Sequence, residues 1–376
     1  MKYLLSTLTL FLILSTSVNG QHTHPGDRPI VFPDVPGYLT LSVDLHMHTV
    51  FSDGSVWPNI RVQEAIRDGI DAISNTEHLE YQPHQDDIPH PDRNRAHDVA
   101  TASAEGSDLM VIRGAEITRS MPPGHNNAVF IEDANKLLME DAMEVFMEVQ
   151  RQGGFAFWDH PNWTAQRPDG IATLTDMHRE LIEKDLLHGI EVVNHTTYSD
   201  EALTIALEND LTILGTSDIH GLVDWDYEVA QGGHRPVTLV FATARTPEAI
   251  KDALFAGRTV AYFQNMVVGK EENLVPLLDA SLNVLSAEYG ENDSVLSVQL
   301  ENTSDVSYIL DDQTEYTFHQ HADVVILEAH KTTELQVKTI ERLDSVELVF
   351  EVLNAITAPD THPMITINVD VNTGEE

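Results

Sequence analysis

Two histidines with one residue between them, His46 and His48, end a segment in which apolar and polar residues alternate. The alternation over residues 39–48 predicts a β-strand, and its period of two places both imidazoles on one face. Imidazoles in this arrangement bind a transition metal, and Asp53, which precedes a glycine, can fold back from the next loop as a third ligand. A single H-x-H pattern more often marks two polar residues at a strand edge, so recurrence of such groups decides the interpretation.

Similar residues follow four further segments that we predict to be strands. They are His78 after 70–76, Glu116 after 109–115, His160 after 155–158, and Asp218 with His220 after 211–216. In a barrel of parallel strands the carboxyl ends lie on one face, and that face carries the active site. Solvent-exposed polar residues have no reason to select strand ends so regularly. We therefore expect these residues to form a metal site.

His195 also follows a predicted strand, at 189–193. This position suits a metal ligand, a proton donor or a substrate contact, and a packed or exposed histidine is an equal alternative. We assign His195 to catalysis, together with Asp218.

Helical segments alternate with these strands. Apolar spacing and end signals predict helices at 59–69, 92–103, 141–152, 176–187, 199–209 and 246–257, and a further strand at 237–242. Thr246-Pro247 is a typical helix start, with a capping hydroxyl and a first-turn proline. Seven strand and helix units favour a parallel α/β barrel over an antiparallel sandwich.

Composition excludes several classes of function. The 376 residues, 42% of them hydrophobic, suffice for more than one domain. With 21 basic and 61 acidic residues the formal charge is −40, which argues against a nucleic-acid-binding surface. The chain has no cysteine, so disulfides, thiolate ligands and a cysteine nucleophile are excluded, and metal ligands must be His, Asp or Glu. Ser52 and Ser217 lack a G-x-S-x-G setting, which argues against a serine hydrolase.

The two ends of the chain differ from its middle. Residues 1–20 have the pattern of a signal peptide, which predicts a secreted or periplasmic protein starting near Gln21; an uncleaved anchor is the alternative. The apolar run at 4–14 is shorter than a bilayer span, and no similar run occurs later, so we expect no transmembrane anchor in the mature chain. We assign 21–268 to the barrel. Residues 269–376 alternate short apolar runs with polar turns and predict a small β-sandwich, which orients the barrel, binds a surface or stabilises the fold.

The motifs together resemble those of the PHP (polymerase and histidinol phosphatase) family. The resemblance spans residues 39–263 and rests on Asp44-Leu45-His46-Met47-His48, Ser52-Asp53-Gly54, Thr76-Glu77-His78, Gly114-Ala115-Glu116, His125, His160-Pro161 and Gly215-Thr216-Ser217-Asp218-Ile219-His220. It implies a distorted (βα)7 barrel with two or three divalent metals, held by His46, His48, Asp53, His78, Glu116, His125, His160, Asp218 and His220. Many relatives have Asp where this chain has Glu77. The export signal and residues 80–95 further resemble the secreted Sb-PDE group of phosphodiesterases.

The ligand types indicate the chemistry. Carboxylates mixed with imidazoles suit Zn, Mn or Fe, and Glu116 is placed to bridge two ions. Paired ions hold a hydroxide and stabilise the attacking and leaving oxygens of an in-line displacement, so no protein nucleophile is needed. The leading hypothesis is a secreted phosphodiesterase that hydrolyses a small phosphate ester. A phosphomonoesterase or amidohydrolase with the same cluster, or a metal-binding module without turnover, are the alternatives.

Substrate contacts are expected in the loops that follow the strands. The candidates are His84, His90, Arg93, Arg119, Trp163 and Arg167. A guanidinium group there forks onto a phosphate or braces its own loop, and Trp163 either stacks on the leaving group or covers the barrel.

Overall fold

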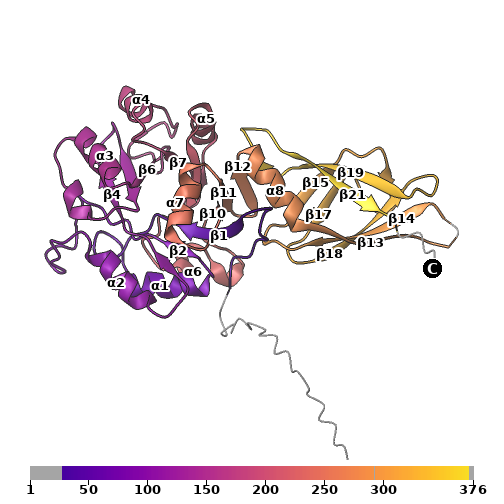
Figure 1. Ribbon diagram of the computed structural model, residues 1–376, viewed down its shortest axis with the longest axis horizontal. Helices are drawn as coiled ribbons and strands as arrows, with labels where there is room; N and C mark the ends of the chain where they lie inside the picture. The colour runs from indigo at the N-terminus through magenta and orange to yellow at the C-terminus, as the bar shows by residue number, and fades with distance from the viewer. Residues whose placement is uncertain (1–27, 292, 372–376) are drawn as a thin grey trace, which may run out of the picture.

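The computed structural model describes residues 28–291 and 293–371. The predicted signal peptide at 1–20 lies outside this range. Figure 1 shows an elongated molecule with an α/β domain at one end and an all-β domain at the other. Within the described residues, none of the helices has the length and apolar composition needed to cross a membrane.

The strands of the α/β domain form two sheets. The seven-stranded sheet has the order β20 (Ala355–Ile356), β12 (Met266–Gly269), β11 (Thr259–Phe263), β10 (Val237–Ala242), β1 (Leu39–Asp44), β2 (Ala72–Ile73), β3 (Met110–Val111). The other has the order β4 (Gly114–Thr118), β5 (His125–Val129), β6 (Phe155–Trp158), β7 (Gly189–Asn194), β8 (Thr197–Tyr198), with β9 (Thr212–Thr216) also paired to β7. Two isolated parallel bridges, Met47 with Ile219 and His78 with Glu116, involve residues at or beside the expected ligands.

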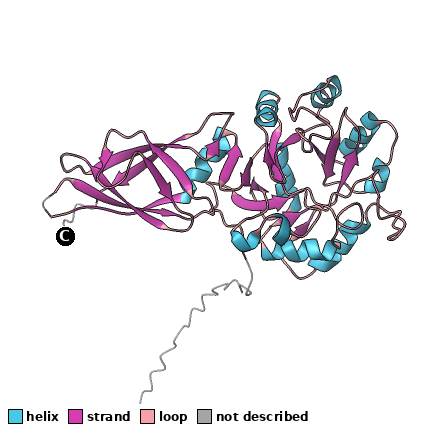
Figure 2. Ribbon diagram, turned by 180° about the vertical axis from the view of Figure 1, so that it is seen from behind, coloured by secondary structure: helices cyan, strands magenta, loops and turns pink. Residues whose placement is uncertain are grey.

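Helices cover the outer faces of these sheets (Figure 2). They are α1 (Pro58–Arg67), α2 (Arg95–Ala104), α3 (Ala142–Arg151), α4 (Asp176–Glu183), α5 (Asp200–Glu208), α6 (Val223–Asp226) and α7 (Pro247–Phe255), with 3₁₀ turns η1 (Ala134–Leu137) and η2 (Val229–Gln231). All six predicted helices form, with ends within a few residues of those expected from the sequence. At α7 the Thr246 side chain accepts a hydrogen bond from the Ala249 amide, as its capping signal predicts.

The strand arrangement departs from a regular parallel barrel. β1, β2 and β3 are parallel, but β10 pairs antiparallel with β1, and β5 is antiparallel to both β4 and β6. β11 and β12 form a hairpin whose two turn residues, Gln264 and Asn265, both have positive φ angles. In the described residues no continuous ladder joins the two sheets, so the barrel is distorted; the two isolated parallel bridges beside the expected site connect one sheet to the other.

The C-terminal domain is the predicted β-sandwich. Its two antiparallel sheets are β13 (Leu282–Tyr289), β14 (Val295–Asn302), β18 (Thr332–Lys338), β16 (Thr317–Phe318) and β17 (Val324–Leu327), β15 (Tyr308–Asp312), β19 (Ser345–Val352), β21 (Met364–Asp370). Buried and more exposed residues alternate along β14 and β19, as expected for strands with one face on the core.

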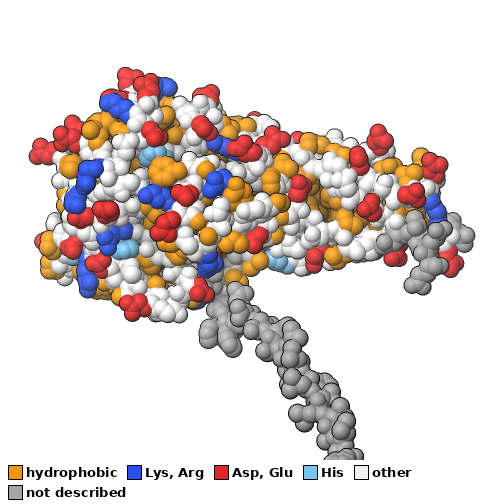
Figure 3. Space-filling view, in the orientation of Figure 1, with side chains coloured by type: hydrophobic (Ala, Val, Ile, Leu, Met, Phe, Trp, Pro, Cys, Tyr) orange, Lys and Arg blue, Asp and Glu red, His pale blue; other side chains and the backbone are white. Residues whose placement is uncertain are grey.

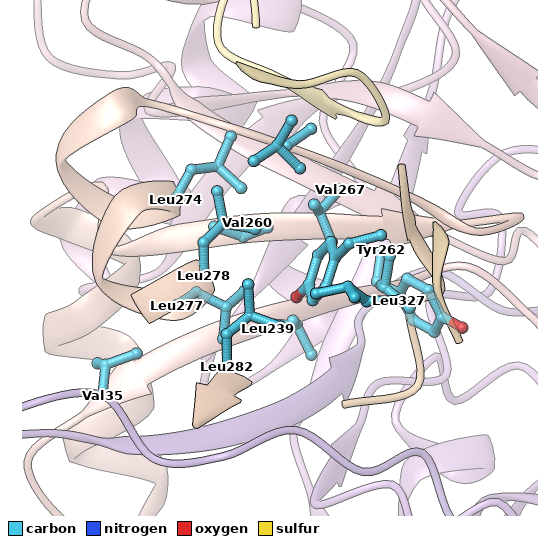
Figure 4. Close-up of a cluster of buried hydrophobic side chains, with 14 of the residues drawn as sticks. Val35, Leu239, Val260, Tyr262, Val267, Leu274, Leu277, Leu278, Leu282 and Leu327 are labelled. Atoms are coloured by element: carbon cyan, nitrogen blue, oxygen red, sulfur yellow. The ribbon is translucent and has the colours of Figure 1, made fainter. Parts of the chain in front are cut away.

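One helix at the junction departs from the small β-sandwich that the sequence predicts for residues 269–376. α8 (Glu271–Ser281) forms even though it contains Pro276, because Leu274, Leu277 and Leu278 lie on one face and are fully buried. Figure 4 shows these leucines beside Val260 and Val267 of the barrel sheet. The C-terminal domain also contributes β20 to the edge of that sheet. One hydrophobic cluster therefore spans both domains.

A buried histidine in α4 gives a testable link between pH and stability. His178 stacks on Trp158 with ring centroids 4.0 Å apart; its Nε2 donates to the Pro123 carbonyl at 2.6 Å, while Nδ1 accepts from the Thr175 amide at 3.2 Å. Burial lowers the pKa of His178 to about 4. The unfolded chain therefore binds more protons than the folded one between that pKa and about 6.5, and stability falls as pH falls through this window.

We expect His178→Gln to be less stable than wild type at pH 7.5, with the gap narrowing by about 2 kcal/mol at pH 5.0. Glutamine at this position retains the capping-box pattern but does not titrate. Urea unfolding of both proteins at the two pH values measures the difference. A gap that stays constant would show that His178 does not carry this pH dependence.

Candidate metal centre

The histidine pair at the end of β1 is buried and faces Asp218. His46 and His48 have no exposed surface, and their Nε2 atoms lie 3.1 Å apart. The backbone after β9 runs alongside, because the Asp218 amide donates to the His46 carbonyl at 2.8 Å and the His48 amide to that of Ile219 at 3.0 Å. This pairing places Asp218 Oδ1 at 3.1 Å from His46 Nε2 and 3.2 Å from His48 Nε2.

Glu116 of β4 lies at the centre of the cluster. Its carboxylate is within 2.5 Å of His125 Nδ1, 3.0 Å of His78 Nδ1 and 3.2 Å of His48 Nε2. Both carboxylate oxygens are nevertheless buried without a hydrogen bond of acceptable geometry among the described residues. A buried carboxylate without hydrogen bonds is costly unless a cation faces it. The imidazole nitrogens around Glu116 are thus arranged like ligands that share a metal ion with its carboxylate, and not like hydrogen-bond donors to it.

Distances within the first ligand group fit a first-row metal. Among His46, His48, Glu116 and Asp218, the measured ligand-atom separations range from 3.1 Å to 3.4 Å. Tetrahedral zinc, with bonds of about 2.0–2.2 Å, places its ligands about 3.3–3.6 Å apart. Three of these four residues, His46, His48 and Glu116, form a group that would hold one ion.

A second group forms around Asp53. Its Oδ2 lies 3.3 Å from His78 Nε2 and its Oδ1 3.2 Å from His220 Nε2. The loop returns to the cluster because the Gly54 amide donates to the Thr49 carbonyl at 2.9 Å. A side chain at Gly54 is excluded, since a Cβ there would lie 2.7 Å from the His48 backbone.

A third group joins Glu116 to His78 and to His125 of β5, and a further group joins His160, which follows β6, to His46 and Asp218. The rings of His125 and His160 have centroids 5.1 Å apart, and the Nδ1 atom of each is buried without a hydrogen bond among the described residues. The structure therefore brings all nine ligands expected from the sequence into overlapping groups that can hold metal ions. Glu116 belongs to more than one of these groups, which suits a bridging ligand.

The electrostatics of the cluster favour positive charge. Although burial opposes ionisation, the pKa of Glu116 is held well below its usual range by His78 and other imidazoles. Burial likewise disfavours charge on His78, but Glu116 and Asp53 raise its pKa to about 11. A divalent cation held by these residues would supply the positive charge that the carboxylates attract and would take the place of protons on the imidazoles.

Sequence reasoning missed Glu191, which orients two of the ligands. Glu191 Oε1 lies 2.7 Å from His46 Nδ1, and Oε2 accepts from the His160 amide at 2.7 Å. Oε1 also accepts from the Thr216 hydroxyl at 2.5 Å. With its Nδ1–H held by Glu191, His46 presents the Nε2 lone pair to the cluster. The only available signal was an acidic residue inside the otherwise apolar strand at 189–193.

Glu77 has a related function in the loop that carries Asp53. Its carboxylate accepts hydrogen bonds from the Thr49 amide at 3.1 Å, the Thr49 hydroxyl at 2.5 Å and the Ser52 hydroxyl at 2.5 Å. Glu77, at the position where many relatives have Asp, therefore holds the 49–53 loop in place.

A cavity of about 800 Å³ opens onto the cluster. All expected ligands line it except His46 and His48, which lie buried behind it. The rest of its wall is formed by Tyr81, Thr118, Asn162, Trp163, Thr164, Gly170, Asn194, His195, Thr197 and Asp226. Trp163 is thus where the sequence-based expectation placed it, with its ring centroid 5.1 Å from that of His160.

The expected arginine contacts are placed elsewhere. Arg119 pairs with Glu80 at 2.8 Å and also donates to backbone carbonyls. Arg93 donates to the Leu79 carbonyl at 3.1 Å and to that of His90 at 3.2 Å, while Arg167 donates to the Thr173 carbonyl. None of the three lines the cavity. The expected phosphate contacts of the three arginines are therefore not found. Their guanidinium groups instead bind nearby carbonyl groups and Glu80, and so stabilise the loops.

The two loop histidines also lie outside the cavity lining. His90 Nε2 is 2.7 Å from Gln82 Oε1 and 2.5 Å from the Phe51 carbonyl, so its ring fastens the loop to the barrel. His84 is half-buried in a turn, where its carbonyl accepts from the Ile88 amide at 2.8 Å. Both histidines were expected to contact substrate, but in the structure their contacts are within or beside their own loop.

His195 lines the cavity and is held in one tautomer. The Tyr227 hydroxyl donates to the Ser217 carbonyl at 2.6 Å, so its oxygen accepts from His195 Nδ1 at 3.0 Å. Nδ1 therefore carries hydrogen, which leaves Nε2 with a free lone pair. His195 also has a φ of 51°, a strained backbone conformation for this residue.

Comparisons with known proteins agree with this architecture. An Ig-like domain family, DUF5001, matches residues 282–368, and no curated protein sequence matches the chain. The crystal structure of a two-domain protein from Bacteroides vulgatus, described as containing a predicted PHP-like metal-dependent phosphoesterase, is 38% identical with a TM-score of 0.85. That alignment covers 92% of this chain and 100% of the other.

Two more distant structures align with part of the chain. A proposed metal-dependent phosphoesterase from Bifidobacterium adolescentis is 19% identical, with a TM-score of 0.38, and covers 48% of this chain and 88% of its own. An amidohydrolase from Chromobacterium violaceum is 16% identical, with a TM-score of 0.35, and covers 48% of this chain and 87% of its own.

Proposed function

Because the chain belongs to the family of PHP-like metal-dependent phosphoesterases, we propose that it is an exported phosphodiesterase. The nine ligands would hold two or three divalent ions, with zinc, manganese or iron as the candidates. Such ions supply positive charge at the phosphate oxygens and an activated water. Export rests on the sequence pattern of residues 1–20 alone.

The reaction is a hydrolysis that needs no protein nucleophile. The oxygen of water adds to phosphorus, the bond from phosphorus to one alcohol oxygen breaks, and a proton from water ends on the released alcohol. His195 lines the cavity and is suited to carry that proton on Nε2, and Trp163 and Tyr81 form part of the same wall.

The choice of a diester rests on one observation, the absence of Lys and Arg among the described residues that line the cavity. A phosphomonoester dianion is best held by cationic groups around all its free oxygens. A diester carries one negative charge, which the metal ions would balance. It also carries a second organic arm, which an apolar wall would bind. The exposed ring of Trp163 provides such a wall.

We expect kcat/KM for an aryl alkyl phosphodiester to exceed that of the aryl monoester by about tenfold, and Trp163→Ala to lower only the diester value. The test is metal analysis of the purified protein followed by kinetics on matched mono-, di- and triesters. Trp57→Ala is the control, because Trp57 is also half-exposed but packs on Phe51 outside the cavity. Equal or better cleavage of the monoester would indicate a phosphatase, and cleavage of amides alone an amidohydrolase.

A further inference from the structure

We propose that the organic arm of the diester carries a positive charge, so that the substrates are esters of amino alcohols or quaternary ammonium alcohols. This inference rests on the phosphodiesterase activity proposed above and concerns the part of the cavity beyond the metal ligands. The observations that carry it are the charges of the wall, one acidic side chain at the rim, and two exposed aromatic rings.

The first observation is that no Lys or Arg among the described residues lines the cavity to balance the charge of an anionic arm. The arginines nearest in sequence, Arg93, Arg119 and Arg167, are engaged by backbone carbonyls or by Glu80. The metals would be engaged with the phosphate, so a second negative group would meet only neutral or acidic residues. Nucleotide and sugar-phosphate arms are therefore disfavoured.

The second observation is Asp226, the acidic residue of the wall that does not belong to a candidate ligand group. Among the described residues its carboxylate has no hydrogen-bonded or ion-paired partner. It lies against the chain after His220, because Gly221 has no side chain and a Cβ there would be 2.7 Å from Asp226 Oδ2. α6 fixes its position, since the Val223 amide donates to the buried Glu64 carboxylate at 2.9 Å.

The third observation is a pair of aromatic rings. Tyr81 and Trp163 line the cavity yet are 51% and 44% exposed. Their rings rest beside His78 and His125, at centroid distances of 5.7 Å and 5.5 Å. Exposed aromatic faces attract ammonium groups through cation–π interactions, and aromatic walls are a recurrent way of binding quaternary ammonium ligands.

The charge of the whole protein acts in the same direction. A formal charge of −40 attracts cations and repels anions at the distances over which a substrate approaches. Figure 3 shows acidic side chains spread over the visible face of both domains, with fewer basic ones. A neutral arm would contact the rings equally well but gain nothing from Asp226, which is why a cationic arm fits this wall best.

The test uses three diesters that all release 4-nitrophenol and differ only in the second arm. The arms are choline, its uncharged isostere 3,3-dimethylbutanol, and an anionic 3-carboxypropyl group. With the full-length metal-loaded protein we expect kcat/KM to be about tenfold higher for the choline ester than for the isostere, and lowest for the anionic ester. The preference should appear in KM and should weaken as salt rises from 50 to 500 mM.

Asp226→Asn should reduce the choline preference, the ratio of kcat/KM for the choline ester to kcat/KM for the neutral isostere, about threefold. Glu228→Gln is the matched control. It removes one negative charge only two residues from Asp226, but the Glu228 side chain does not line this cavity. Hydrolysis of all three esters without a choline preference would overturn this inference and leave the phosphodiesterase intact. Failure to hydrolyse any of them would remove both.

Discussion

Replacing Glu116 by glutamine should lower the metal content of the protein by at least one ion per chain and its phosphoesterase rate by more than about a hundredfold. Glu116 is fully buried, and its two oxygens face ligand nitrogens of His46, His48, His78 and His125. An amide neither balances the charge of two cations nor bridges them well. Loss of residues that merely support metal ligands already costs about 10–100-fold, so loss of a shared ligand should cost more.

Elemental analysis of purified wild type and Glu116→Gln, each reloaded with the same metal, gives the stoichiometry. Glu105→Gln is a control for the charge change, because Glu105 is exposed after α2 and belongs neither to the candidate ligand groups nor to the cavity lining. Circular dichroism checks that both variants fold. Unchanged metal content together with unchanged turnover would place Glu116 outside the metal centre.

The cluster illustrates which features a sequence reveals. His46 and His48 were identified because strand period fixes their common face, and Glu116 and His160 because each ends a recognisable apolar run. Such signals are local. The chain pairing that brings Asp218 beside His46 is not local, yet it was inferred because strand ends of a barrel share one face.

Residues that act through tertiary contacts gave no such signal. Glu191 reads as an acid in a strand, and only the folded chain shows that it holds His46 and His160. The loop arginines were expected at the phosphate, but a guanidinium group takes whichever carbonyl or carboxylate the fold places near it. α8 was missed because Pro276 breaks the helical pattern, while burial of its leucines outweighs that local cost.

Replacing His195 should slow the reaction in a manner that depends on the leaving group. Its Nδ1–H is held by Tyr227, so Nε2 is the atom that can give a proton to the departing alcohol oxygen. We expect His195→Gln to lower kcat by about 10²-fold or more for a diester that releases an alkyl alcohol. For release of 4-nitrophenol the loss should be less than about tenfold, because a stable phenolate leaves without a proton.

Tyr227 should act on the same step as a positioning residue. Tyr227→Phe removes the acceptor of the Nδ1 hydrogen while retaining the ring, whose centroid lies 5.5 Å from that of His195. We expect an intermediate loss, about tenfold, with the same dependence on leaving group, and no further loss when it is combined with His195→Gln. His319→Gln, at an exposed position in the C-terminal domain, serves as the control.

The dependence on leaving group separates proton transfer from a structural effect. A histidine that only shaped the cavity or supported a metal ligand would, when replaced, slow both substrates by the same factor and change the metal content. Equal losses for alkyl and aryl leaving groups would therefore exclude His195 as the proton donor. A selective loss at unchanged metal content would instead assign the proton to Nε2, and the strained backbone of His195 would then be explained by the need to place that atom in the cavity.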